Sequence, residues 1–371
     1  SRGLGDVYKR QLLRFNLYLP NLDNELEFYL IMKKSATIYD ISEKLNISAA
    51  TVSRALNDHP KISQKTKELV MKAAKELNYK QNTLAQALKS GKTNNIGIIV
   101  PYINTNFFSS LIRGIEEELS PHGYHVIICQ SHEDVDLERK QLNTLLNAQV
   151  DGIFMSVSKT TEDISHIEAA KESNTPIIFF DRKKDIAGIS TVTIDDYKGG
   201  YLATEHLIKQ GCRRICHLSG DLRLEIYQNR YNGYIDALKD NKLTFKEEYV
   251  FPIKSSIEDG VEAIKTLWNL SSPPDGIFSA SDYAALGACQ QLKKKNISIP
   301  EDVAIIGFSN EPFTQYMELP ISSVDQTPDI MGKISAQVFL EYMNENFSGI
   351  SIEKKVVLNP QIHIRKSSKR K

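Results

Sequence analysis

The chain has 371 residues, of which 41% are hydrophobic, and its 46 Lys and Arg balance its 46 Asp and Glu to a formal net charge of zero. The length allows several domains, and the even balance excludes a uniformly basic or acidic chain. The charge is unevenly placed, because residues 32 to 95 hold 12 basic and 5 acidic side chains, whereas residues 96 to 371 hold 30 and 37. A basic segment of this kind attracts phosphates.

Residues 1 to 31 have the pattern of neither a signal peptide nor a membrane span. The first eleven show no periodicity, and charged residues interrupt the mildly apolar stretch that follows. A signal peptide places positive charge before an unbroken apolar run, and a membrane span needs about 18 apolar residues. We interpret the segment as a non-native or disordered leader with Met32 as a candidate start. A genuine extension helix is the alternative.

Residues 37 to 57 predict two short helices joined by a tight turn. Thr37 and Ser48 stand where helix caps are expected. Apolar side chains then recur at helical spacing: Ile38, Ile41, Leu45, Val52 and Leu56. Small polar groups and one arginine remain outside, as in a helix-turn-helix whose second helix enters the DNA major groove. A three-helix packing module with a solvated polar face is the alternative.

A third helix is predicted after Ser63, its N-terminal cap. Its buried stripe is expected to consist of Leu69, Val70, Ala73, Ala74 and Leu77. The segment from Asn78 to Gly91 then continues with Asn82, Ala85 and Leu88 at three-residue intervals.

The run from Thr37 to Gly91 resembles the DNA-binding headpiece of the LacI-type (lactose-repressor) family of bacterial regulators. The resemblance rests on Thr37-Ile-Tyr-Asp-Ile, Ser48-x-x-Thr-Val-Ser-Arg54, Asn57 and Asn78-Tyr-x-x-Asn82-x-x-Ala85-x-x-Leu88. It implies phosphate contacts for Ser48, Thr51, Ser53 and Asn57, and base contacts for Ala49, Ala50 and Arg54. It places Asn82, Ala85 and Leu88 in a hinge helix that opens the minor groove. Tyr39 and Tyr79 complete the DNA-binding candidates.

Two adjacent alanines set this predicted recognition helix apart. Ala49 and Ala50 can offer methyl contacts, for example to thymine, but no hydrogen bonds. Base discrimination should then depend mainly on Arg54, whose guanidinium suits two hydrogen bonds to guanine.

From Ile96 onward, apolar runs alternate with helical patterns. The predicted strands are 96–100, 124–129, 151–155, 176–180, 214–218, 249–251, 274–278 and 303–308. The predicted helices between them are 107–119, 137–147, 162–173, 230–238, 260–270 and 284–295. This order predicts an α/β fold with doubly wound parallel sheets in two similar halves that face each other across a cleft.

The resemblance extends over roughly residues 33 to 365, and it implies a core similar to the periplasmic sugar-binding fold. We therefore expect a helix-turn-helix headpiece at 32–80, a hinge helix and linker at 81–95, a two-subdomain core at 96–365 and a basic tail at 366–371. The chain should cross between the subdomains near residues 194 and 323.

Ligand candidates are polar or aromatic residues in loops at the carboxyl ends of predicted strands, where open α/β sheets bind ligands. They are Asn106, Phe107, Phe108, Asp181, Arg182, Arg230, Asp282 and Ser309. The resemblance supports the loop with Phe107 and Phe108, Arg230, Asp282 and the position of Ser309, although many family members have aspartate there. A surface pair is the alternative for Asp181 with Arg182, and a structural salt bridge is the alternative for Arg230.

The sequence offers no pattern for catalysis or for a metal site. Cys129, Cys212, Cys216 and Cys289 form no matched pairs, and no phosphate-binding loop or nucleophile elbow is present. We expect no cofactor and no enzyme activity, and free cysteines suit a reducing cytoplasm.

The sequence therefore predicts a cytoplasmic, homodimeric repressor that binds a palindromic double-stranded operator, has no membrane partner, and is controlled by a small-molecule effector, a sugar. The competing class is a solute-binding protein, which the core alone would permit. The identity of the effector, the operator and the direction of the response do not follow from the sequence.

Overall fold

The computed structural model describes residues 36–80, 91–173, 175–345 and 353–370. The chain divides into two compact units between Ala85 and Gln86. The leader predicted for residues 1 to 31, and Asn82, Ala85 and Leu88 of the predicted hinge helix, lie outside the described residues.

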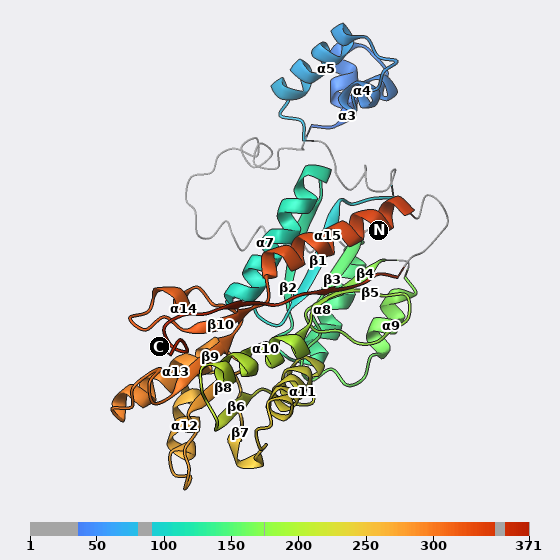
Figure 1. Ribbon diagram of the computed structural model, residues 1–371. Coiled ribbons are helices and arrows are strands. Elements are labelled where there is room, and N and C mark those ends of the chain that lie inside the picture. The colour runs from blue at the N-terminus through green and yellow to red at the C-terminus, as the bar shows by residue number, and fades with distance from the viewer. Residues whose placement is uncertain (1–35, 81–90, 174, 346–352, 371) are drawn as a thin grey trace, which may run out of the picture. The chain divides into compact units, whose positions relative to one another are not determined.

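The first unit contains the helices α3 (Ile38–Leu45), α4 (Ala49–Leu56) and α5 (Gln64–Glu76) (Figure 1). Side chains cap the second and third helices: Ser48 Oγ accepts from the backbone N of Thr51 at 3.1 Å, and Ser63 Oγ accepts from that of Thr66 at 3.2 Å. The helices share one apolar cluster centred on the fully buried Ile41, Val52 and Val70. This unit therefore has its own small core.

One residue of the predicted third-helix stripe is not buried. Leu69 is 49% exposed, whereas Val70, Ala73 and Ala74 are buried and Leu77 packs against the same cluster. Leu69 precedes Val70 by one position, about 100° around the helix, and therefore lies beside the inner face.

The second unit contains two six-stranded sheets. The N-terminal sheet has the order β11-β5-β4-β3-β1-β2, and its neighbouring strands are all parallel. Its strands are β1 (Asn95–Val100), β2 (His125–Gln130), β3 (Gly152–Met155), β4 (Ile177–Phe180), β5 (Ser190–Ile194) and β11 (Lys355–Leu358).

The C-terminal sheet has the order β12-β10-β9-β8-β6-β7, and only β12 is antiparallel to its neighbour. Its strands are β6 (Ile215–Ser219), β7 (Val250–Pro252), β8 (Gly276–Ser279), β9 (Ala304–Phe308), β10 (Ser322–Asp325) and β12 (Gln361–His363). Two sheets of mainly parallel strands confirm the predicted α/β fold class.

Helices cover both faces of each sheet (Figure 1). On the N-terminal sheet, α7 (Asn106–Leu119) and α15 (Pro328–Glu345) pack on one face, and α8 (Val135–Asn147) and α9 (Ser165–Lys171) on the other. On the C-terminal sheet, α10 (Asp196–Lys209) and α11 (Glu225–Asp240) pack on one face, and α12 (Ile257–Leu267) and α13 (Asp282–Lys294) on the other. Each subdomain is thus a three-layer sandwich.

Three connections link the subdomains. The chain passes from β5 into α10, from β10 into α15, and from β11 into β12. The expected crossing points near residues 194 and 323 lie at the end of β5 and within β10. The third connection was not predicted, because the strands on either side of it were not recognised.

The described residues of the predicted basic tail, 366–370, pack on the C-terminal subdomain. Ser367 and Ser368 are fully buried, and Ser368 Oγ lies 2.7 Å from Nε2 of His206. The Arg370 guanidinium donates to the backbone oxygens of Pro300, Asp275 and Asp302. Polar side chains with these partners stabilise the C-terminal subdomain from within.

Paired helices approach each other at backbone distance through glycine. A Cβ atom on Gly200 of α10 would lie 2.2 Å from the carbonyl oxygen of Arg230, and one on Gly233 of α11 would lie 2.1 Å from that of Tyr197. Gly114 and Gly332 make the same close contact between α7 and α15. Only glycine permits these distances.

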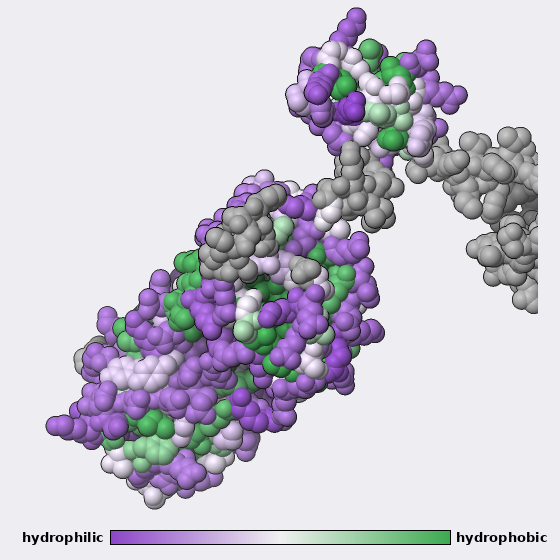
Figure 2. Space-filling view, turned by 90° about the vertical axis from the view of Figure 1, so that its right-hand side faces the viewer, coloured by the Kyte–Doolittle hydropathy of each residue, from purple (hydrophilic) through white to green (hydrophobic). Residues whose placement is uncertain are grey.

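Within the described ranges, none of the helices is both long enough and apolar enough to cross a bilayer. On the face of the second unit that Figure 2 shows, hydrophilic residues predominate, with smaller hydrophobic patches between them.

Candidate functional site

The first candidate site is the outer face of α4. Ser48, Ala50, Arg54 and Asn57 are exposed. Ser48 Oγ lies 2.9 Å from Thr51 Oγ1, and Asn57 Nδ2 donates to the Ser53 backbone oxygen at 2.8 Å. These contacts hold short polar groups along one side of the helix, where they can reach a phosphate backbone.

Three of the predicted DNA-binding residues on α4 are half-buried, and the two predicted tyrosines differ in exposure. Ala49, Thr51 and Ser53 have intermediate exposure. Tyr39 is 71% exposed on α3, whereas Tyr79 packs partly against the three-helix cluster. The Arg54 side chain forms no hydrogen bond or ion pair with any described residue, so its guanidinium is available to an external partner.

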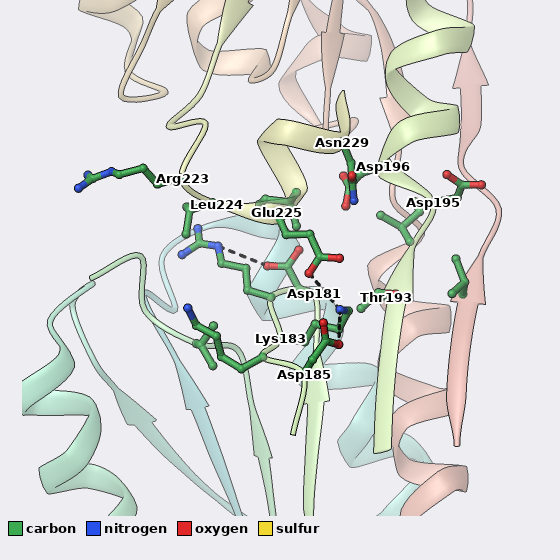
Figure 3. A pocket seen from close by; sticks show the side chains of 16 residues that line it. Asp181, Lys183, Asp185, Thr193, Asp195, Asp196, Arg223, Leu224, Glu225 and Asn229 are labelled. Atoms are coloured by element: carbon green, nitrogen blue, oxygen red, sulfur yellow. Dashed lines mark hydrogen bonds and ion pairs between the residues drawn. The ribbon is translucent and has the colours of Figure 1, made fainter. Parts of the chain in front are cut away.

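The second candidate site is a cavity of about 340 Å³ between the two core subdomains (Figure 3). The N-terminal subdomain contributes residues from the ends of β3, β4, β5 and β11: Val157, Asp181, Arg182, Lys183, Lys184, Asp185, Thr193, Ile194 and Val357. The connection into the C-terminal subdomain and its first helices contribute Asp195, Asp196, Arg223, Leu224, Glu225, Ile226 and Asn229. Its size suits a small molecule.

Of the eight predicted ligand residues, Asp181 and Arg182 line this cavity. Asp181 is 6% exposed, and its Oδ2 accepts from Ser156 Oγ at 3.3 Å. Arg182 Nη1 donates to both carboxylate oxygens of Glu133, at 2.8 and 2.9 Å. Burial raises the pKa of Asp181, an effect that Arg182 and Arg230 oppose.

Arg230 lies behind the cavity and is 3% exposed. Its Nε donates to Asp196 Oδ1 at 2.7 Å, its Nη1 donates to the Ala280 backbone oxygen, and its guanidinium stacks 3.6 Å from the centre of the Phe308 ring. Burial raises the pKa of Asp196 to about 6, although Arg230 opposes the rise. Arg230 thus forms the structural ion pair that the sequence left open.

Phe107 and Phe108 do not line the cavity. Each is 7% exposed within the core between α7 and the N-terminal sheet. Asn106 begins α7. Burial raises the pKa of Glu311 in the C-terminal subdomain, and a hydrogen bond from the backbone N–H of Asn106 opposes that rise. The expected aromatic ligand surface is therefore part of the hydrophobic core.

Ser309 and Asp282 support loops of the C-terminal subdomain. Ser309 Oγ donates to Gln326 Oε1 at 3.0 Å. Asp282 is 1% exposed and accepts from Ser323 Oγ at 2.7 Å and from the backbone N of Glu311 at 2.8 Å. Neither residue is among those that line the cavity.

Asp282 should make the stability of the core depend on pH. Burial raises its pKa from 3.8 to about 8, so between these values the folded chain holds a proton that the unfolded chain has released. The free energy of unfolding should therefore fall as the pH rises through this window and level off above it. Denaturant titrations from pH 6 to 8 would measure the slope of the unfolding free energy against pH. The range begins at pH 6 because the raised pKa of Asp196 is about 6.

Asp282→Asn should flatten that slope. The amide can accept from the Glu311 N–H through its oxygen and donate to the Ser323 hydroxyl through its nitrogen, so the variant should fold. A slope equal to that of the unchanged chain would show that another group carries the titration.

The sequence missed Asp196, Lys183 and Glu225 at this cavity. Asp196 follows β5, a strand that the apolar-run criterion did not detect, and Glu225 begins α11 before its predicted start. Lys183 follows Arg182 directly, and extending the predicted loop by one residue would have included it. Among the described residues, no group of three or more His, Cys, Asp or Glu side chains could hold a metal ion.

Comparison with known proteins gives two family matches. Residues 37–82 match the family described as bacterial regulatory proteins, lacI family, and residues 93–357 match periplasmic binding proteins and sugar binding domain of LacI family. Catabolite control protein A of Priestia megaterium is 31% identical over 336 residues, which cover 90% of this chain and all of that protein.

Two further proteins are similar over nearly their whole length. The transcriptional repressor PurR of Haemophilus influenzae (strain PittEE) is 30% identical over 336 residues, covering 90% of this chain and 99% of that protein. The solved complex of the transcriptional regulator CelR with cellobiose is 26% identical, covers 90% of this chain and 99% of that one, and superimposes with a TM-score of 0.67.

Proposed function

Because the chain belongs to the LacI family of bacterial regulatory proteins, a family of DNA-binding transcriptional regulators rather than enzymes, we propose that it represses transcription as a homodimer on a palindromic operator. A hydroxyl-bearing small molecule, a sugar, binds between the core subdomains and changes the affinity for DNA. The protein acts in the cytoplasm, where a bacterial regulator meets its DNA.

The exposed face of α4 carries the DNA-binding part of this proposal. It presents the Arg54 guanidinium, which has no partner in the described part of the chain, between short polar side chains at Ser48 and Asn57. An arginine in the major groove reads guanine, and hydroxyl and amide groups fix the helix on phosphates. In a homodimer two such helices would read two half-sites, which favours a palindrome.

The cavity between the subdomains supports the effector part. Its lining comes from both halves and is rich in carboxylates, which accept hydrogen bonds from hydroxyl groups. The relative CelR was solved with cellobiose, and the matched core family includes sugar binding domains. A ligand that contacts both halves favours the arrangement in which both contacts form, and this preference can be linked to DNA affinity.

Selection from a random duplex library would test the DNA-binding role. The full chain should enrich one palindromic sequence, and the Arg54→Ala variant should enrich it poorly. A solute-binding protein, the competing class, would enrich no sequence. A thermal-shift screen of common monosaccharides and disaccharides would then test the effector: a sugar that stabilises the chain should also change operator binding, whereas sugars without effect on either would remove the effector assignment.

A further inference from the structure

The charges around the cavity are unevenly paired. Each lining cation except Lys184 already has a carboxylate at 3.0 Å or less. Arg182 Nη1 is 2.8 Å from Glu133, Lys183 Nζ is 3.0 Å from both Asp185 and Glu225, and Arg223 Nη2 is 2.7 Å from Asp221. Figure 3 shows Lys183 bound to its two carboxylates at once. These three cations therefore already have carboxylate partners at the cavity.

The lining carboxylates are not matched in the same way. Asp196 is bound to Arg230 at 2.7 Å, and Asp195 caps α10 by accepting from the backbone N of Lys198. One lysine serves both Asp185 and Glu225. Among the described residues, the Asp181 carboxylate has only two partners: the Ser156 hydroxyl at 3.3 Å, and Arg182 Nε at 3.9 Å, which is beyond hydrogen-bond distance.

Asp181 is also a buried carboxylate at this site with no described cation within hydrogen-bond distance. It is 6% exposed and lines the cavity. Its backbone is left-handed, with φ of 59°, a conformation uncommon for residues other than glycine and often found at functional sites. Arg182 Nε beside it is buried and has no hydrogen-bond partner among the described residues. Among the described residues, no cation therefore lies within hydrogen-bond distance of Asp181, although Arg182 Nε is 3.9 Å away.

The remaining lining favours a compact aliphatic ring. The apolar surface comes from Val157, Ile194, Leu224, Ile226 and Val357, and the described part of the chain contributes no aromatic side chain to the lining. A flat aromatic ligand would have no ring to stack against. A saturated ring with polar substituents fits such a surface, with its donors directed to the carboxylates.

We propose that the ligand of this cavity is an amino sugar or a similar polyhydroxylated amine, whose protonated amino group binds Asp181. This inference rests on the proposed effector function. The ammonium would donate directly to Asp181, which none of the described lining cations does at hydrogen-bond distance, and its neighbouring hydroxyl groups would donate to the other carboxylates. A charge-assisted hydrogen bond at a buried carboxylate is stronger than one from a neutral hydroxyl.

Calorimetric titration of the full chain with matched hexoses tests the inference. The probes are D-glucosamine, N-acetyl-D-glucosamine and D-glucose, together with the corresponding galactose series. The free amine should bind about tenfold or more tightly than either neutral partner. Because burial raises the pKa of Asp181, lowering the pH should weaken the amine as that carboxyl becomes protonated, with less effect on neutral sugars.

Asp181→Asn provides the matched variant. Asparagine has the same shape and tolerates the left-handed backbone, so the fold should persist while the charge is lost. The preference for the amine should disappear. Asp240→Asn, at the exposed end of α11 outside the cavity, removes the same charge and should keep the preference.

Three results would overturn the inference. If neutral hexoses bind as tightly as the amines, the sugar effector assignment stands and the proposed ammonium contact with Asp181 fails. An Asp181→Asn variant that still prefers the amine would place the ammonium elsewhere. If none of these hexoses binds, the inference fails, and the thermal-shift screen over other monosaccharides and disaccharides decides separately whether the sugar assignment stands. Operator selection tests the DNA-binding role independently of both.

Discussion

Arg230→Ala is expected to lower the free energy of unfolding of the core by about 3–5 kcal/mol, because removing one partner of a buried ion pair leaves the other charge uncompensated. The pair is nearly closed to solvent, with side-chain exposures of 4% for Arg230 and 5% for Asp196. The variant also loses the contact with the Phe308 ring and the hydrogen bond to Ala280. Equilibrium denaturation in urea would measure the loss.

Arg223→Ala is the control for this prediction. Arg223 is 78% exposed, and its ion pair is with Asp221, two residues away; an exposed pair of this kind contributes little. The urea unfolding midpoint of the Arg223→Ala variant should stay close to that of the unchanged chain. Removing Asp196 together with Arg230 should recover part of the lost stability, because no unpaired charge then remains. Equal stability of the Arg230→Ala and Arg223→Ala variants would refute the structural role.

A lost ligand response in Arg230→Ala would have two explanations. Arg230 holds Asp196, which lines the cavity, and Arg230 itself is not among the lining residues. Ligand binding should therefore be measured at a temperature where denaturation shows the variant to be folded. A response retained there at the same ligand concentration would remove Arg230 from the effector site.

Arg54→Ala is expected to reduce discrimination between operator and random duplex by on the order of 1–3 kcal/mol. The Arg54 side chain has no partner among the described residues, and the neighbouring Ala49 and Ala50 offer no side-chain hydrogen bonds. Fluorescence anisotropy with the selected operator and a scrambled duplex, at one fixed salt concentration, would measure both affinities. An equal loss on the two duplexes would show that Arg54 contacts only phosphate.

Lys72→Ala gives a matched loss of positive charge in the same unit. Lys72 is exposed on α5 rather than on the recognition face of α4. Whatever affinity it contributes should be lost equally from operator and random DNA, because a general electrostatic attraction does not depend on sequence. A change in discrimination would point to an additional base contact.

The headpiece could be predicted because its signals are local. Ser48 and Ser63 cap the helices that follow them, and apolar residues four positions apart meet in one cluster. Leu69 was wrongly predicted to be buried, because the spacing of apolar residues locates the buried face of a helix only approximately. Which neighbour lies innermost depends on how three helices pack together.

Strands β5 and β10 could not be predicted from apolar runs. Ser322 and Ser323 of β10 are fully buried, yet their hydroxyl groups bond to Arg365, Ser368 and Asp282. Buried hydroxyl groups of this kind need partners that only the folded chain brings near. The residues that line the cavity could likewise be predicted only in part. Asp181 follows a recognisable strand, whereas Asp196 and Glu225 come next to Asp181 only after the chain crosses between the subdomains.

The glycines between paired helices restrict how the core can rearrange. Gly200 and Gly233 bring the backbones of two helices into contact, and Gly114 and Gly332 do the same for another pair. At these contacts no side chain lies between the helices, so none can change its rotamer to let one helix slide along the other. Sliding of packed helices, the shear mechanism, is thus disfavoured within each subdomain. Any opening or closing must be a hinge rotation of two rigid bodies, with the change in backbone torsion confined to the three connections after β5, β10 and β11.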